Sequence, residues 1–151
     1  LAGLFQEFNH PLRGIRIVSD WERGIIKAIR DTLPMLSHQG CLFHALKCTN
    51  HKLSQFGLKI AGTTFPIIKE WTNRVRASFF LPRCFYDSAR ILEVPVTPAH
   101  SQYAACKNFL DYFKEEWLVH PETMTSKFMV ERHRTSNLVE AWHRGAMDHF
   151  V

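Results

Sequence analysis

Fold class depends most on the stretch Ile15-Arg16-Ile17-Val18-Ser19-Asp20-Trp21-Glu22. Its apolar residues predict the end of a short buried strand. Ser19 and Asp20 then close the strand and open a helix. A carboxylate at the carboxyl end of a buried strand is well placed for metal binding, because the strand fixes its backbone and the following loop leaves its oxygens free. The simpler interpretation, which spacing alone favours, is that Asp20 only caps the next helix.

The residues that follow predict a strand–helix–strand–helix order and then a helix-rich half. An apolar stripe at helical spacing predicts a helix over Glu22–Leu33, which Pro34 ends. A second strand is expected at Gln39–Phe43, and Val94–Pro98 is expected to be a linker. Further helices are expected at about 44–56, 67–80, 83–92, 99–118 and 137–150. This order indicates an α/β protein with an all-helical insertion or appendage.

Composition places the chain among globular domains. Its 151 residues are 46% apolar, enough for one domain with a core. No apolar run approaches the ~20 residues that a membrane helix needs, so no membrane partner is expected. The four cysteines are too sparse for a disulfide scaffold, and they favour a reduced intracellular setting.

Positive charge is concentrated in one segment, Thr32–Cys84. It holds seven basic residues and one acid, Glu70, whereas the whole chain has a net charge of +5. A basic block in a globular domain suits a polyanion such as nucleic acid. A solvated basic face without a function is the equally weighted alternative. The residues expected to contact nucleic acid are Lys47, Lys52, Lys59, Arg74 and Arg76.

Cysteine and histidine alternate in a second candidate site at positions 41, 44, 48 and 51. Cys41-Leu42-Phe43-His44 and Cys48-Thr49-Asn50-His51 have the spacing of half-sites for zinc. In a straight helix, however, residues 41 and 51 would lie about 15 Å apart. One ion cannot bind all four ligands at that separation, so a small zinc-binding protein is a minor hypothesis.

A second carboxylate, Glu140, is a further candidate ligand. It lies three residues after Asn137, which resembles a capping box, and four before Arg144, which allows an ion pair. The alternative is a metal ligand presented by a helix that packs beside the sheet. His133 and His143 are potential general bases or phosphate contacts, although nothing in their spacing separates them from surface histidines.

Taken together, these blocks resemble the transposase domain of Mutator-like elements, the MULE family. The resemblance covers about Arg13 to Met147 and depends on the order of the blocks, since no single one is specific. They are Ser19-Asp20-Trp21-Glu22, Ala28-Ile29, Gly40-Cys41-Leu42-Phe43-His44, Leu81-Pro82, Arg134-Thr135-Ser136-Asn137 and Val139-Glu140-Ala141-Trp142-His143.

The resemblance implies a ribonuclease H-like fold that cuts and joins DNA with Mg²⁺ or Mn²⁺ held by an Asp-Asp-Glu triad. Asp20 matches the second Asp, Glu140 matches the Glu, and Cys41 and His44 match the family's Cys-x-x-His signature. DNA as partner, self-association and a nuclear location are implied as well. The expected organisation is one partial domain, with an α/β core part at 13–60, a helical insertion at 61–125 and a returning C-terminal helix at 126–151.

The sequence departs from the family pattern in its N-terminal part. No aspartate precedes Asp20 in the sequence, whereas the family's first Asp lies on the first strand of the fold. We therefore expect a fragment that lacks the N-terminal part of the fold, holds Mg²⁺ or Mn²⁺ poorly with two of the three ligands, and is inactive as a nuclease. The alternative hypothesis is a domesticated, non-catalytic transposase remnant that binds DNA or a protein.

Overall fold

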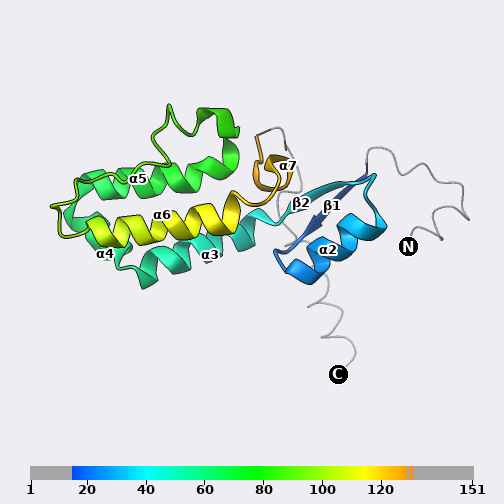
Figure 1. Cartoon of the computed structure of the whole chain (residues 1–151), viewed down its shortest axis with the longest axis horizontal. Coiled ribbons are helices and arrows are strands. Elements are labelled where there is room, and N and C mark those ends of the chain that lie inside the picture. Colours follow the sequence, from blue (N-terminus) through cyan, green and yellow to red (C-terminus); the bar gives the residue numbers. More distant parts are fainter. Residues whose placement is uncertain (1–14, 129, 131–151) are drawn as a thin grey trace, which may run out of the picture.

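The computed structural model describes residues 15–128 and residue 130. Two strands and six α-helices make up this part of the chain, with a two-stranded region at one end and a helical region at the other (Figure 1). The elements are β1 (Arg16–Ser19), α2 (Arg23–Thr32), β2 (Ser37–Gly40), α3 (Leu42–Gln55), α4 (Leu58–Thr64), α5 (Pro66–Ala77), α6 (Tyr103–Trp117) and α7 (Glu122–Thr125), with 3₁₀ turns at Ser78–Phe80 and Arg83–Phe85.

The sheet consists of β1 and β2 in parallel, with Arg16 opposite Ser37 and Ser19 opposite Gly40. Parallel neighbours need a crossover between them, and α2 supplies it. Both strands therefore end on the same side, where Asp20 follows β1 and Cys41 follows β2. The mixed α/β class predicted from the sequence is confirmed at this level, and the described part is mostly helical.

The second strand lies earlier than the sequence predicts. It covers Ser37–Gly40 rather than Gln39–Phe43, and Leu42 and Phe43 already belong to α3. β2 is polar, Ser-His-Gln-Gly, so it has no apolar alternation from which it could be predicted. The strand is instead specified by its backbone pairing with β1 and by the contact between His38 and Ser19.

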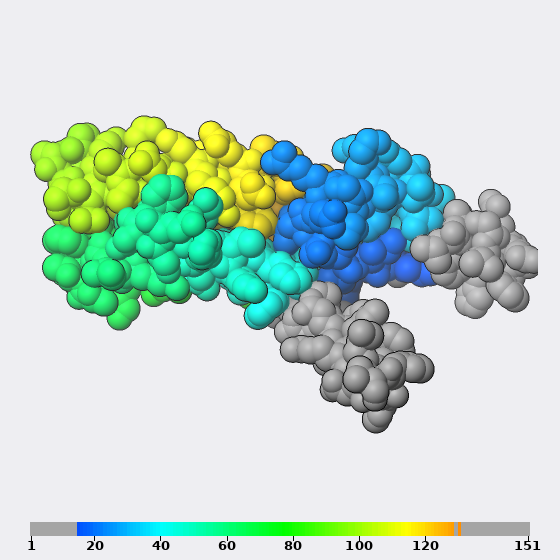
Figure 2. All heavy atoms as spheres, turned by 90° about the horizontal axis from the view of Figure 1, so that it is seen from below, coloured from blue at the N-terminus to red at the C-terminus, as the bar shows by residue number. Residues whose placement is uncertain are grey.

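The helical region holds the hydrophobic core. Side chains from α3, α4, α5, α6 and the segment between α5 and α6 form one buried cluster, whose largest members are Trp71, Phe79, Phe109, Phe113 and Trp117. Edge-to-face ring contacts join them, as between Trp71 and Phe109 at 5.7 Å and between Phe79 and Trp117 at 5.5 Å. In the space-filling view this region occupies the left of the molecule and the two-stranded region the right (Figure 2).

Two predicted helices are shorter than expected. The segment 83–92 contains only the turn Arg83–Phe85 followed by further turns, and Arg90 has a left-handed φ of 51° that no helix accommodates. α6 begins at Tyr103 rather than Ala99, because hydrogen-bonded turns occupy Thr97–Gln102. The helix expected at 137–150 lies outside the described residues. Within them, no helix is long and apolar enough to cross a membrane.

Candidate functional site

Asp20 lies at the carboxyl end of β1, where the sequence predicted it. Its Oδ1 accepts a hydrogen bond from the backbone N–H of Glu22 at 3.1 Å. This bond closes a turn ahead of α2, whose own N-cap residue is Glu22. No basic side chain of the described residues lies within salt-bridge distance of Asp20. The carboxylate is half-buried.

The side chain before Asp20 is tied to the neighbouring strand. Ser19 Oγ donates to the carbonyl oxygen of Asp20 and lies 2.8 Å from Nε2 of His38 on β2. Since a hydroxyl has one proton, Nε2–H of His38 donates to Ser19 Oγ. Burial lowers the pKa of His38, and the charges of Lys127 and His120 lower it further. A neutral His38 thus positions the backbone of Asp20.

Trp21 connects the end of β1 with the end of β2. Its Nε1–H donates to the carbonyl oxygen of Cys41 at 2.9 Å, and its ring lies directly over Gly40. A Cβ on Gly40 would come within 2.1 Å of this ring, so only glycine fits. The ring also meets Trp117 edge-on at 4.9 Å and thereby reaches the helical core. No sequence pattern predicts this role, although Trp21 and Gly40 both lie in blocks that resemble the MULE family.

Cys41 and His44 lie at the start of α3. Cys41 is the fully buried N-cap residue, and its N–H donates to the carbonyl oxygen of Ser19 at 2.6 Å. Cys48 and His51 lie further along α3 and are exposed, whereas Cys41 is buried. Among the described residues no three His, Cys, Asp or Glu side chains gather as a metal site, so the four-ligand zinc hypothesis is wrong for this geometry.

Glu140, His133 and His143 lie outside the described residues. Asp20 is therefore the only member of the predicted carboxylate pair that can be placed. Its turn offers one hard oxygen ligand to a divalent cation, a number compatible with Mg²⁺ bound through one carboxylate together with substrate phosphates.

A buried lysine near the same strand ends was not predicted. Lys127 is 1% exposed, and its Nζ donates to the carbonyl oxygen of Met124 at 3.0 Å. Burial lowers its pKa to about 8, with Arg16 lowering it further and Cys41 opposing. Burial also lowers the pKa of His120, whose ring lies 5.2 Å from that of Trp21. No sequence pattern predicts either residue, since both lie in irregular segments after α6.

Three of the predicted nucleic-acid contacts line one surface, which we call the α3–α6 groove. Lys47, Lys52 and Lys59 border it, and its volume is about 1030 Å³. Lys52 Nζ lies 5.2 Å from the ring centroid of Tyr112. Glu116 is the one acid among its lining residues, which also include Phe43, His44, Leu46, Cys48, Asn50, His51 and Ser54.

The other basic residues face elsewhere. Arg74 donates to Glu70 Oε1 at 2.7 Å, while Arg76 donates to side chains on α3 and α5. Arg83, part of the basic segment, is used internally. Its guanidinium donates to the carbonyl oxygens of Trp117, Leu118 and His120 at the end of α6, and to Thr125 Oγ1. The basic segment is thus not one continuous face.

Comparisons with protein-family models, with curated proteins and with solved structures found no match for this chain.

Proposed function

We propose that the chain is part of a MULE-type DNA transposase catalytic domain with a ribonuclease H-like core. The observation that carries this proposal is the unit β1–α2–β2. It brings the end of the strand before Asp20 beside the end of the strand before Cys41, in parallel register. The Trp21 hydrogen bond to Cys41 joins these two quoted blocks. The helical region that follows agrees with a helical insertion after the signature.

In this function Asp20 is a ligand of a divalent cation. Mg²⁺ or Mn²⁺, when bound, polarises the DNA phosphate and activates the attacking water or 3′-hydroxyl. The chain's own contribution is to hold the carboxylate: the N–H of Glu22 orients Oδ1, and neutral His38 fixes Ser19 beside it. Glu140 is the second proposed ligand. Cys41 and His44 carry the family signature at the adjacent strand end and are not proposed as metal ligands.

Mn²⁺ binding followed by NMR tests this assignment without requiring turnover. Bound Mn²⁺ broadens nearby amide signals, so those of Ser19, Asp20 and Trp21 should disappear first in the wild type. Asp20→Asn should abolish this selective broadening. Asp31→Asn is the matched control, because Asp31 is an exposed acid at the other end of α2. Equal broadening in wild type and Asp20→Asn would overturn the assignment.

A second function, nucleic-acid binding without catalysis, is favoured by the α3–α6 groove. Lys47, Lys52 and Lys59 line it together, and no carboxylate of the described residues pairs with them. Tyr112 adds an aromatic surface under Lys52. Cationic side chains beside an aromatic ring suit a phosphate backbone with a base stacked next to it.

Salt dependence of DNA affinity tests this second function. Each phosphate contact contributes about −0.9 to the slope of log affinity against log salt for duplex DNA. Replacing the three lysines by glutamine should therefore flatten the slope by up to about 3 units. Lys107→Gln is the control, because Lys107 already pairs with Asp111 on α6. An unchanged slope in the triple variant would exclude this groove as the DNA surface.

A further inference from the structure

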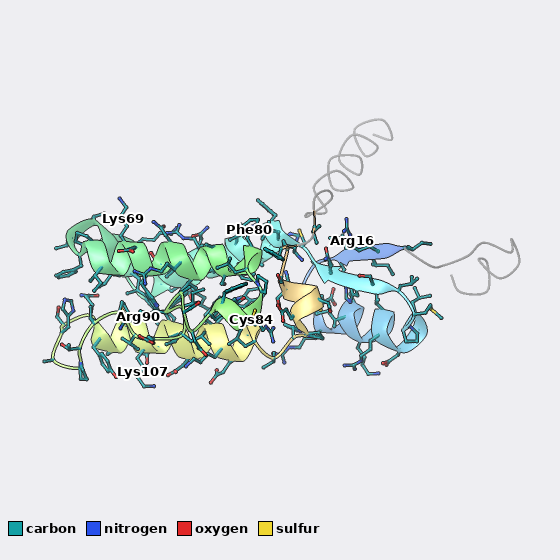
Figure 3. The ribbon with its side chains drawn as sticks, turned by 90° about the horizontal axis from the view of Figure 1, so that it is seen from above. Arg16, Lys69, Phe80, Cys84, Arg90 and Lys107 are labelled. Carbon is teal, nitrogen blue, oxygen red and sulfur yellow. The ribbon has the colours of Figure 1, made fainter. Side chains whose placement is uncertain are left out.

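Helix α5 separates two depressions of different character. Lys69, Thr72, Asn73 and Arg76 recur at intervals of three and four residues, so they share one face of the helix. Trp71 and Arg74 lie on another face, toward the loop that holds Arg90. Figure 3 shows Lys69 and Arg90 on opposite sides of α5.

The depression on the first side, which we call the α4–α5 cleft, has a volume of about 180 Å³. Lys59 and Gly62 of α4 border it, opposite Lys69 and Arg76 of α5. The backbone comes close here because Gly62 has no side chain: a Cβ would lie 3.5 Å from Cα of Lys69. Leu53, Leu58, Thr63, Thr72 and Asn73 complete the lining, which contains no acid.

The charges of this cleft are not neutralised. Among the described residues, no carboxylate lies within salt-bridge distance of Lys59, Lys69 or Arg76. Arg76 is nevertheless held in place, because its nitrogens donate to the carbonyl oxygen of Thr72, to Asn50 Oδ1 and to Asn73 Oδ1. All of these acceptors are uncharged, so the guanidinium is fixed in position and keeps its full charge.

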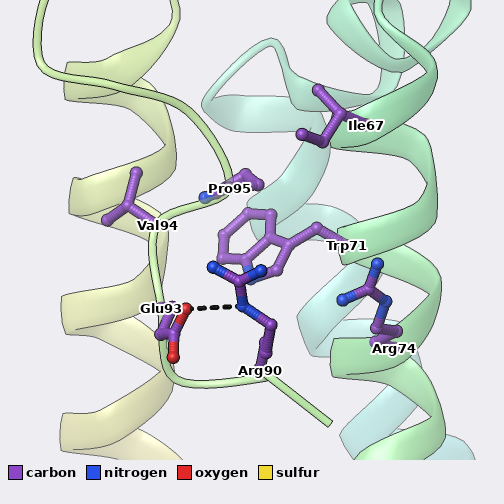
Figure 4. A pocket seen from close by; sticks show the side chains of 7 residues that line it. All are labelled: Ile67, Trp71, Arg74, Arg90, Glu93, Val94 and Pro95. Atoms are coloured by element: carbon purple, nitrogen blue, oxygen red, sulfur yellow. Dashed lines mark hydrogen bonds and ion pairs between the residues drawn. The ribbon is translucent and has the colours of Figure 1, made fainter.

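The depression on the other side of α5 provides the contrast. There Arg74 is paired with Glu70 at 2.7 Å and Arg90 with Glu93 at 2.8 Å. Figure 4 shows the Arg90–Glu93 pair beside the Trp71 indole, with Arg74 to one side. Each guanidinium in this pocket already has an acid of its own, so an added anion would have to compete with a carboxylate. Of the two depressions beside α5, the α4–α5 cleft is the one whose cations have no carboxylate partner among the described residues.

We infer that the α4–α5 cleft is a binding site for a phosphate group, held by Lys59, Lys69 and Arg76. A phosphate oxygen accepts charge-assisted hydrogen bonds from ammonium and guanidinium groups, and the two lysines approach from one helix each. The group is carried either by a small phosphomonoester or by a nucleic-acid backbone. The site is independent of Asp20, which lies in the two-stranded region.

Titration of the isotope-labelled 151-residue chain with inorganic phosphate tests the site. At constant ionic strength, the amides of Gly62, Lys69 and Asn73 should shift and saturate, while chloride should leave them unchanged. The double variant Lys59→Gln/Lys69→Gln should bind at least about tenfold more weakly, since it loses two charge-assisted contacts. Both lysines are exposed, so these substitutions leave the core intact.

Arg74→Gln is the matched control, because it removes a cation from the opposite face of the same helix. It should bind phosphate as the wild type does. The inference is overturned if phosphate produces no saturable shift beyond that of chloride. It is also overturned if the double variant binds as tightly as the wild type, or if Arg74→Gln weakens binding equally.

Two further probes distinguish a small phosphomonoester from a nucleic-acid backbone as the source of the phosphate group. Phosphoserine presents a phosphomonoester, and a short oligonucleotide without a terminal phosphate presents only phosphodiesters. Competition by phosphoserine alone assigns the cleft to a small phosphorylated ligand. Competition by the oligonucleotide assigns it to a nucleic-acid backbone, in which case Lys59 connects the cleft with the α3–α6 groove that it also lines. If neither competes with inorganic phosphate, the inference is overturned.

Discussion

The two-stranded region and the helical region are stabilised in different ways. In the helical region Trp71, Phe113 and Trp117 are each at most 2% exposed. In the two-stranded region α2 contributes no buried residue, and Ile25 on its apolar stripe is 37% exposed. Desolvation of aromatic side chains therefore stabilises the helices, whereas backbone pairing and a few specific contacts hold the strands.

Trp21 shows how the weaker region is attached to the stronger one. Trp21 follows the end of β1, and its indole N–H donates to the carbonyl oxygen of Cys41 at the end of β2. Its ring packs on the helical cluster through contact with Trp117. The strand ends are therefore positioned by the helical core rather than by a core of their own. Asp20 is the residue next to Trp21. The helical region therefore holds the backbone of this candidate site in place.

The largest expected change in the free energy of unfolding comes from a substitution in the helical core. Phe113→Ala should lower the free energy of unfolding by about 3–5 kcal/mol, because Phe113 is 1% exposed and packs against Phe79 and Phe109. Ile25→Ala is the counterpart in the two-stranded region and should cost less than about 1 kcal/mol. Urea denaturation followed by circular dichroism measures both. Equal losses would contradict the difference between the regions.

The next largest effect is expected from the buried charge of Lys127, through the pH dependence of the free energy of unfolding. The Lys127 ammonium donates to the carbonyl oxygen of Met124 at 3.0 Å, and burial lowers its pKa from 10.5 to about 8. Between these values the unfolded chain binds more protons than the folded chain, so stability rises with pH. Relative to Lys127→Met, the wild type should gain up to about 3 kcal/mol from pH 8 to pH 10.5.

Urea denaturation of both proteins across this pH range measures the difference, and using Lys127→Met as reference cancels the titration of tyrosines and cysteines. At pH 7 the methionine variant should be the more stable, because it buries no charge. A pH-independent difference between the two proteins would show that the ammonium is not desolvated in the folded chain.

Gly40→Ala tests the contact that joins the regions. The new Cβ would meet the Trp21 ring at 2.1 Å, and overpacking of this kind costs about 1–3 kcal/mol. In a Trp21→Ala background the same substitution should cost almost nothing, since the ring is gone. Thermal denaturation of the four proteins of this cycle gives the coupling. An equal cost in both backgrounds would place the strain elsewhere.

The smallest effect should be a gain. Gly24 lies within α2, and a Cβ there would meet only Glu22 Oε1 at an ordinary 3.6 Å. Gly24→Ala should therefore raise the free energy of unfolding by about 0.5–1 kcal/mol through helix propensity. A gain measured by urea denaturation would show that α2 unfolds together with the helical region. No change would show that α2 unfolds separately and earlier.

Much of the element order could be predicted from the sequence. Apolar stripes and prolines located α2, α3 and α5 to within a few residues, and Ile17 and Val18 located β1. β2 was misplaced because Ser37 and His38 have no apolar pattern, whereas Cys41–Phe43 does. The helix expected over 83–92 fails at Arg90, whose left-handed φ belongs to a local turn in which the N–H of Ile91 donates to the carbonyl oxygen of Tyr86 and the N–H of Arg90 to that of Asp87.

The candidate site was less accessible from the sequence. Asp20 lies at the predicted strand end, and its role as a metal ligand stays a prediction, as does that of Glu140. Spacing could not reveal that Gly40 accommodates Trp21, because the two residues meet only through the parallel pairing of β1 and β2. Spacing also treated Arg74 and Arg76 alike, although the helix phase directs them to different depressions beside α5.

Pro66 occupies the first turn of α5, where its missing N–H costs no helical hydrogen bond and its fixed φ suits the start of the helix. A residue inserted or deleted within α5 would turn everything beyond it by about 100°. Lys69 and Arg76 would then no longer share a face, and Trp71 would leave the core. Length changes among homologues of this chain should therefore be confined to the loops on either side of α5, and substitutions at Pro66 should be rarer than its exposure suggests.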